Sequence, residues 1–242
     1  MIKNEIKKYK ALLAEVPALT LTLFVLSTIL MNLLANKCIF AYGEWLAIDG
    51  GILVAWLCFM TGDMITQRFG AKAAIRMNVL CAAITVFTSL IFALVAAIPS
   101  GNGEDFSAID SILGQNWFII LGSVTAFILG TCINALINAA IGRLFKKNPD
   151  GKLAYVTRSY ISTFIGQFID NAVFAGIVFM IFAPMYWGWG YTWKQMIGCS
   201  LIGAVAELIS QVIFSPIGYK VVMSWKAHGV GNQYLSTFGL EA

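Results

Sequence analysis

The 242-residue chain is 59% hydrophobic and only 12% charged, and its mean hydropathy is +0.80. These values lie far from those of soluble domains, so we expect an integral membrane protein. The net charge of +4 comes without a basic stripe that has aromatic residues interleaved, so it gives no reason to expect a nucleic-acid partner. One histidine and five cysteines without CxxC spacing offer no ligand set, so the sequence predicts no metal site and no cofactor.

Six mostly apolar stretches, each long enough to span a bilayer, follow one another along the chain. They lie near residues 18–36, 48–66, 77–97, 116–142, 160–184 and 195–221. Little chain remains between them, so we expect a single polytopic α-helical membrane domain over residues 1–242. Residues 1–17 carry four lysines and no cleavable apolar core, and are expected to be a retained cytosolic segment.

The distribution of Lys and Arg predicts the orientation, because these residues are held on the cytoplasmic side of a membrane. With the N-terminus inside, fourteen of the sixteen fall on the cytosolic side, and only Lys37 and Lys194 lie outside. Both termini are therefore expected in the cytoplasm, with the protein in the inner or plasma membrane. The 98–115 loop has three acids and no base, so it is expected to face outward as a mobile turn.

Three polar residues interrupt the fifth stretch, YISTFIGQFIDNAVFAGIVFMIFAP, namely Gln167, Asp170 and Asn171. A carboxylate at the centre of a membrane helix costs about 2.5–3.5 kcal/mol on insertion scales, so its presence favours a functional role. Together with Thr163 these residues follow spacings of three and four. They therefore share one helix face, which we expect to point into the bundle or into a wet cavity.

Polar pairs at i, i+4 recur in four other predicted spans. They are Asn32 and Asn36, Asp63 and Gln67, Asn134 and Asn138, and Glu207 and Gln211. Polar stripes on five of six helices predict a central polar cavity. For any single Asn, hydrogen bonding between helices is the simpler explanation. For Asp170 and Glu207 a binding role is favoured, because contacts between helices need no charge. Asp63 leaves two interpretations open, a salt bridge with Arg68 that closes the cytosolic end and a contact with substrate.

The expected lining of this cavity suits a planar, nitrogen-rich heterocycle. Carboxylates and amides supply acceptors and paired donors, and aromatic rings supply stacking faces. Trp45 and Trp56 are candidate stacking residues. Trp56 lies seven residues before Asp63 and so shares its helical stripe, although an ordinary lipid-facing position explains it nearly as well.

Four segments carry a resemblance to a known family. TGDMITQRFGAKAAIR (61–76) resembles the second-helix signature of the queuosine precursor transporter family, also called the vitamin uptake transporter family. MNLLANK, STFIGQFIDNAVF and ELISQVIFSPIGY resemble its first, fifth and sixth helices. The resemblance implies a six-helix bundle similar to the substrate-binding component of energy-coupling-factor transporters. It also implies uptake of a 7-deazaguanine precursor of queuosine, such as preQ0, preQ1 or queuine, and no enzymatic activity.

Two positions depart from the family pattern. In GTCIN, Asn134 stands where the family usually has an acid, and Gln211 replaces a Lys common in the last helix. The two changes remove one acid and one base, so they are consistent either with a compensated pair or with a shifted substrate.

The chemistry of a guanine-like edge then suggests how the predicted residues divide the work. Asp170 or Glu207 would accept a ring N–H and an exocyclic NH₂ together, and Gln167 or Asn171 would serve the carbonyl and ring nitrogen. The remaining candidates for contact with substrate are Asn32, Asn134, Gln211, Trp45, Trp56 and Asp63.

Several alternatives stay open from sequence. One is uptake of another small heterocyclic vitamin or a nucleobase, and another is a scaffold in which the polar stripe only joins helices. An intramembrane aspartyl protease using Asp63 and Asp170 is disfavoured, because Met60 replaces a glycine of that motif and the two acids lie at different predicted depths. No GxxxxGK loop is present, so the energy source stays open between a separate energising module and proton coupling. The oligomeric state, including a homodimer, also stays open.

Overall fold

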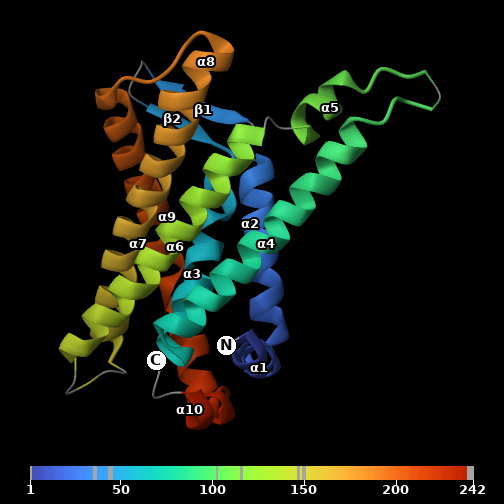
Figure 1. Cartoon of the computed structure of the whole chain (residues 1–242). Helices are drawn as coiled ribbons and strands as arrows, with labels where there is room; N and C mark the ends of the chain where they lie inside the picture. The colour runs from blue at the N-terminus through green and yellow to red at the C-terminus, as the bar shows by residue number, and fades with distance from the viewer. Residues whose placement is uncertain are drawn as a thin grey trace.

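The computed structural model describes residues 2–34, 37–42, 46–101, 103–114, 117–145, 148 and 151–238. It consists of helices and a two-stranded sheet (Figure 1). The long helices are α2 (Ala18–Leu34), α3 (Ile52–Phe69), α4 (Ala71–Ala96), α6 (Trp117–Gly142), α7 (Lys152–Ala175) and α9 (Trp193–Ala227). The shorter elements are α1 (Ile2–Glu15), β1 (Cys38–Tyr42), β2 (Leu46–Asp49), α5 (Ser107–Leu113), the 3-10 turn η1 (Arg143–Phe145), the π-helix η2 (Gly176–Phe182), α8 (Ala183–Trp187) and α10 (Asn232–Phe238).

Each predicted span contains one long helix, but the span predicted at 48–66 begins in β2, and the span predicted at 160–184 continues through η2 and α8. Within the described part of the chain, four helical segments are long and apolar enough to cross a membrane, and a fifth is added if the bent α1–α2 pair counts as one span. The four are α4, α6 with η1, α7 through α8, and α9. The helical membrane fold is therefore confirmed. The helix of the fifth predicted span begins earlier than expected, at Lys152, which shortens the predicted 143–158 loop.

Three local features were not expected from the sequence. The chain after α2 forms an antiparallel hairpin, in which Phe40 pairs with Ile48. The 98–115 loop, predicted as a mobile turn, contains the helix α5. The axes of α1 and α2 differ by 107°, because Pro17 disfavours a helical conformation at Val16 and ends α1 there.

The bundle is not evenly packed. α6 packs on α7, α7 on α9, and α9 on α3, whereas the upper end of α4 lies apart from α7 and α9, next to α5 (Figure 1). The buried residues of α4 end at Thr85, and Leu90 and Leu94 beyond it are exposed. The half of α4 that lies next to α5 is therefore the least buried part of this helix.

Glycines bring α6 and α7 close together. A Cβ placed on Gly130 would lie 2.7 Å from the Cβ of Asp170, and one on Gly166 would lie 2.8 Å from the Cβ of Asn134. Each glycine thus forms a notch that receives a polar residue of the facing helix, a packing common between membrane helices. These two notches fix the register of α6 against α7.

The end of the bundle that carries α1 and α10 is closed by arginines and aromatic rings (Figure 1). Arg76 at the start of α4 forms an ion pair with Glu5 of α1, 3.1 Å apart, and donates a hydrogen bond to the hydroxyl of Tyr234 at 3.2 Å. Phe69, at the α3–α4 turn, contacts the ring of Tyr234 edge-on. The N-terminal and C-terminal helices are thereby fastened under the α3–α4 turn.

Candidate substrate site

Asp63 of α3 is fully buried and lies at the centre of a network of polar side chains. Its Oδ1 accepts hydrogen bonds from the amide groups of Asn134, at 3.0 Å, and Asn138, at 3.1 Å. Both donors come from α6, one helical turn apart. The polar pair predicted in the fourth span is therefore directed at the acid of the second span.

The other carboxylate oxygen of Asp63 faces α7 and α9. Its Oδ2 accepts from the hydroxyl of Ser159, from the hydroxyl of Thr163 at 3.3 Å and from the amide of Gln211 at 3.2 Å. Gln211 also donates to the hydroxyl oxygen of Ser159 at 2.9 Å. Four helices thus meet around one carboxylate.

Five donors use the acceptor capacity of this carboxylate, which has about four lone-pair sites. Hydrogen bonds to an ionised group are the strong ones, and together they offset the cost of burying the charge. Arg158 is connected to the carboxylate through Asn138. Its Nε donates at 3.2 Å to the backbone and side-chain oxygens of Asn138. Asp63 is therefore held by the protein itself, and it organises the amides around it.

Of the two interpretations left open for Asp63, the salt bridge with Arg68 is wrong. Arg68 points toward the C-terminal segment, where it donates to the backbone oxygen of Val230 and, at 2.6 Å, to the side-chain oxygen of Asn232. Residues five apart lie about 140° from each other around a helix, so the two side chains leave α3 on different sides.

Several buried amide atoms near this network have no hydrogen-bond partner. On α6 and α9 these are the side-chain oxygens of Asn134 and Gln211, and on α7 the side-chain nitrogens of Gln167 and Asn171. A buried polar group left unpaired costs roughly 1–3 kcal/mol, so each of these atoms calls for an explanation. The set contains both acceptors and donors, which is what a ligand with a mixed hydrogen-bonding edge requires.

The two acids predicted to bind substrate lie in the neighbouring part of the bundle. Asp170 is partly buried and packs against Gly130 of α6. Glu207 is also partly buried, one helical turn from Gln211 on α9. The amide of Asn171 reaches α9, because a Cβ placed on Gly203 would lie 2.8 Å from its nitrogen.

Trp56, one of the two predicted aromatic residues, does not join this group. The ring of Trp56 stacks on Phe214 of α9 with centroids 3.6 Å apart, and its indole N–H donates to the backbone oxygen of Leu53. One face of the indole is thus already covered. Trp45 lies outside the described residues, as does Asn36.

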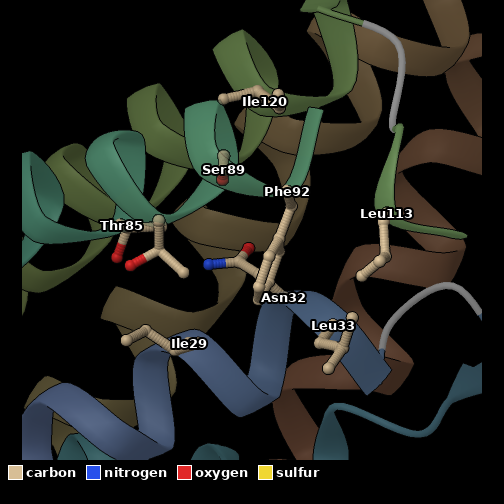
Figure 2. A pocket seen from close by; sticks show the side chains of 9 residues that line it. Ile29, Asn32, Leu33, Thr85, Ser89, Phe92, Leu113 and Ile120 are labelled. Carbon is tan, nitrogen blue, oxygen red and sulfur yellow. The ribbon is translucent and has the colours of Figure 1, made fainter. Parts of the chain in front are cut away.

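Asn32 lies in a separate cavity, which we call the outer cleft (Figure 2). Its amide donates to the backbone oxygen of Thr28 at 3.1 Å and accepts from the hydroxyl of Ser123 on α6. The outer cleft is narrow, with a cavity volume of about 20 Å³, and it is partly open to the surroundings. Its lining comes from α2, α4, α5 and α6 and consists of Ile29, Asn32, Leu33, Thr85, Thr88, Ser89, Phe92, Leu113 and Ile120.

A second cavity, which we call the inner cavity, lies between α2, α3, α4 and α6. It is lined by Phe24, Cys58, Phe59, Gly62, Thr66, Ala74, Asn78, Thr131, Asn134 and Ala135. Asn134 joins the inner cavity to the network, because the same side chain donates to Asp63. Asn78 was not among the predicted site residues, and its isolated position in an otherwise apolar span was the available signal.

Sequence reasoning also missed Ser159 as a contact of the buried acid. Ser159, Thr163 and Gln167 follow one another at four-residue intervals on α7, so the helical stripe extends one turn further than the predicted set. The hydroxyls drew little attention because Ser and Thr are common in membrane helices.

Long apolar helices that enclose a buried carboxylate and unpaired amides define a polytopic membrane protein with an internal polar site, the architecture of a membrane transporter. Residues 49–221 match the family described as "Putative vitamin uptake transporter", and the chain belongs to this family. The predicted family resemblance is thereby confirmed, and the protein is a transporter and not an enzyme.

A curated relative gives a more specific comparison. The chain is 26% identical over 161 residues to the "Probable queuosine precursor transporter" of Bacillus subtilis (strain 168). The aligned region covers 65% of this chain and 67% of the relative. No solved structure matches the chain.

Proposed function

We propose that the protein imports a queuosine precursor, a 7-deazaguanine such as preQ0, preQ1 or queuine. The observation that carries this proposal is a set of four buried amide atoms without a hydrogen-bond partner. Two are oxygens, on Asn134 and Gln211, and two are nitrogens, on Gln167 and Asn171. A guanine-like edge presents ring N–H and exocyclic NH₂ donors beside carbonyl and ring-nitrogen acceptors, so it complements both kinds. The name of the Bacillus subtilis relative supports the same ligand class.

The carboxylate that binds the ligand is Asp170 or Glu207 in this proposal. Asp63 is filled by five protein donors and therefore positions Asn134 and Gln211 without contacting the ligand. A carboxylate that accepts two parallel N–H bonds distinguishes guanine-like edges from most other heterocycles. Uptake of another heterocyclic vitamin or of a nucleobase is the second candidate, since the same amides suit several small bases.

The transport domain in this proposal is a single six-span bundle in the inner or plasma membrane. α2 and α3 join the four longer helical segments as spans, and α1 lies outside the membrane because it turns away from α2 by 107°. Lys and Arg then gather at the end that holds α1 and α10, which supports a cytoplasmic location of both termini in this proposal. This arrangement is the one expected for a substrate-binding component of the energy-coupling-factor type.

A ligand-induced thermal shift tests the proposal. The purified protein is heated with preQ0, preQ1, queuine or guanine, because a ligand that binds the folded state raises apparent stability by mass action. We expect a shift with at least one deazaguanine, and we expect it to fall strongly in Asp170→Asn or Glu207→Gln. A folded protein that gives no shift with any of the four would return the substrate to another heterocycle.

Gln167→Leu sharpens the same test. The substitution removes a buried amide without a partner on its nitrogen, so the ligand-free protein should keep its melting temperature or gain slightly. The loss of one buried ligand hydrogen bond should weaken binding by roughly 10-fold or more. Gln233→Leu, at an exposed position of α10, is the matched control and should leave both quantities unchanged.

A further inference from the structure

We infer that the ligand enters from the outer side through the outer cleft and the inner cavity in series, and that a layer formed by Thr28, Cys58 and Cys81 separates the two. This inference rests on the proposed function. It assigns Asn32, Thr85 and Ser89 to a first contact site for a small polar heterocycle, distinct from the amides around Asp63. The three residues come from α2 and α4, and the upper end of α4 lies apart from α7 and α9 (Figure 1).

The outer cleft is suited to a first contact with a planar polar ligand. Figure 2 shows the amide of Asn32 projecting between Thr85 of α4 and the ring of Phe92, with Leu113 of α5 at the far side. Amide and hydroxyl groups supply donors and acceptors, and the phenyl ring supplies a stacking face. The cleft lies at the α5 end of the bundle, which faces outward in the proposed orientation.

Helical spacing places the two cavities one above the other. On α2, Asn32 lines the outer cleft, and Phe24, two turns away, lines the inner cavity. On α4, Thr85 lines the outer cleft and Asn78 the inner cavity. The residues of each pair are therefore separated by roughly two turns of helix, and each turn rises about 5.4 Å. The residues between them are Thr28 on α2 and Cys81 on α4.

The intervening layer is closed by weak contacts. The hydroxyl of Thr28 lies 3.4 Å from the sulfur of Cys58 and 3.3 Å from the sulfur of Cys81, and all three residues are fully or almost fully buried. Thiols are weak hydrogen-bonding groups, and no ion pair joins these three side chains. Separating α2 from α3 and α4 at this level therefore breaks less than separating helices that share the Asp63 network.

The inner end of this route leads to the proposed binding residues. Asn134 lines the inner cavity and also donates to Asp63, and its side-chain oxygen is one of the unpaired acceptors. A ligand that passes the Thr28 layer therefore meets an open acceptor at once.

Entry on the opposite side of the bundle is disfavoured. The α6–α7 seam is held by the Gly130 and Gly166 notches, and the α7–α9 seam by the contact of Gly203 with Asn171. Opening the α6–α7 seam separates backbones that lie close together, and opening the α7–α9 seam breaks the contact of Asn171 with Gly203, whereas α4 contributes no buried residue beyond Thr85.

A pair of tryptophan substitutions on α4 tests the route. Ser89→Trp fills the outer cleft, while Leu90→Trp places the same ring on the exposed face, where Leu90 is 62% exposed. We expect Ser89→Trp to lower uptake of the deazaguanine at least 10-fold and Leu90→Trp to remain near wild type. The thermal shift of Ser89→Trp should persist, because the Asp63 amides are untouched. Equal uptake by the two variants would overturn the inference.

The native thiols provide a second measurement, which decides the question if Ser89→Trp fails to fold. A variant that keeps Cys81 alone, the other cysteines being Ser, is treated with a maleimide in the presence and absence of ligand. We expect the ligand to change the labelling rate of Cys81 at least fivefold. The control variant keeps Cys199 alone, which lies on α9 outside both cavities, and should not respond.

The outcomes separate the route from the function. A ligand that shifts the melting temperature but leaves Cys81 labelling unchanged would refute the route alone. A protein without a thermal shift for any deazaguanine would refute the proposed function, and the route would fall with it.

Discussion

Replacing Asp63 should separate its role as an organiser of the bundle from the presence of a charge. Asp63→Ala removes the common acceptor of five donors. The amide nitrogen of Asn134 loses its described acceptor, at a cost of roughly 1–3 kcal/mol, and each of the other donors loses a charge-assisted bond at a smaller cost. The hydroxyls can rotate, and Gln211 keeps its bond to Ser159. The total comes to about 3–5 kcal/mol of destabilisation.

Asp63→Asn should cost far less, within about 1 kcal/mol of wild type. The amide oxygen keeps the two bonds from α6, and the new NH₂ can donate to the hydroxyl oxygens of Ser159 and Thr163. These two acceptors use both N–H groups of the new amide, and Gln211 keeps its bond to Ser159. The cost of burying a charge also disappears.

Unfolding of the purified variants by denaturant in detergent micelles gives the comparison. The expected order of stability is wild type and Asp63→Asn together, with Asp63→Ala clearly below. If Asp63→Ala unfolds at the same denaturant concentration as Asp63→Asn, the five hydrogen bonds do not hold the helices together and the reasoning fails.

Two further predictions concern packing and pH. Gly130→Ala should destabilise the bundle by about 1–3 kcal/mol, because the added methyl overpacks the α6–α7 seam. Gly176→Ala is the control and should be neutral, since nothing lies within 4 Å of a Cβ placed there. Thermal unfolding of both variants provides the check. The hydrogen bond from Arg76, aided by Lys8, holds the pKa of Glu5 below its ordinary value of 4.5, so the α1 contact stabilises the protein above that pH and loses this effect as the pH falls below it. Melting temperatures from pH 3 to 6 should therefore show a fall in wild type that Glu5→Gln lacks, and parallel curves for the two proteins would contradict the role of this ion pair.

The helices could be predicted from the sequence because a membrane span is defined by composition and length. The β1–β2 hairpin could not, since its residues sit between two spans where short apolar segments fit a helix end equally well. The start of α7 at Lys152 was missed for a related reason. Lys152 and Arg158 were interpreted as loop residues, although the first turns of a membrane helix readily carry basic side chains outside the apolar core.

For the site, periodicity predicted the face on which a residue lies but not the neighbour that it meets. Asn134 and Gln211 were selected correctly as parts of one polar centre, and the structure joins both to Asp63. The same rule placed Asn32 in that centre, but α2 turns its stripe toward α4 and α6 instead. Which helices are adjacent is a tertiary property, and the periodicity along a single sequence does not reveal it.

The interlocked seam between α6 and α7 has a mechanical consequence. Because the two notches interlock at two levels, α6 and α7 should move as one rigid unit. We expect α4 to change its position relative to this unit during transport. Spin labels placed across α6 and α7 should keep a constant separation through a transport cycle, while a pair across α4 and α6 should change. A substitution at either notch would then affect transport through the rigidity of this helix pair, and also through Asp170 and Asn134, the residues that the notches receive.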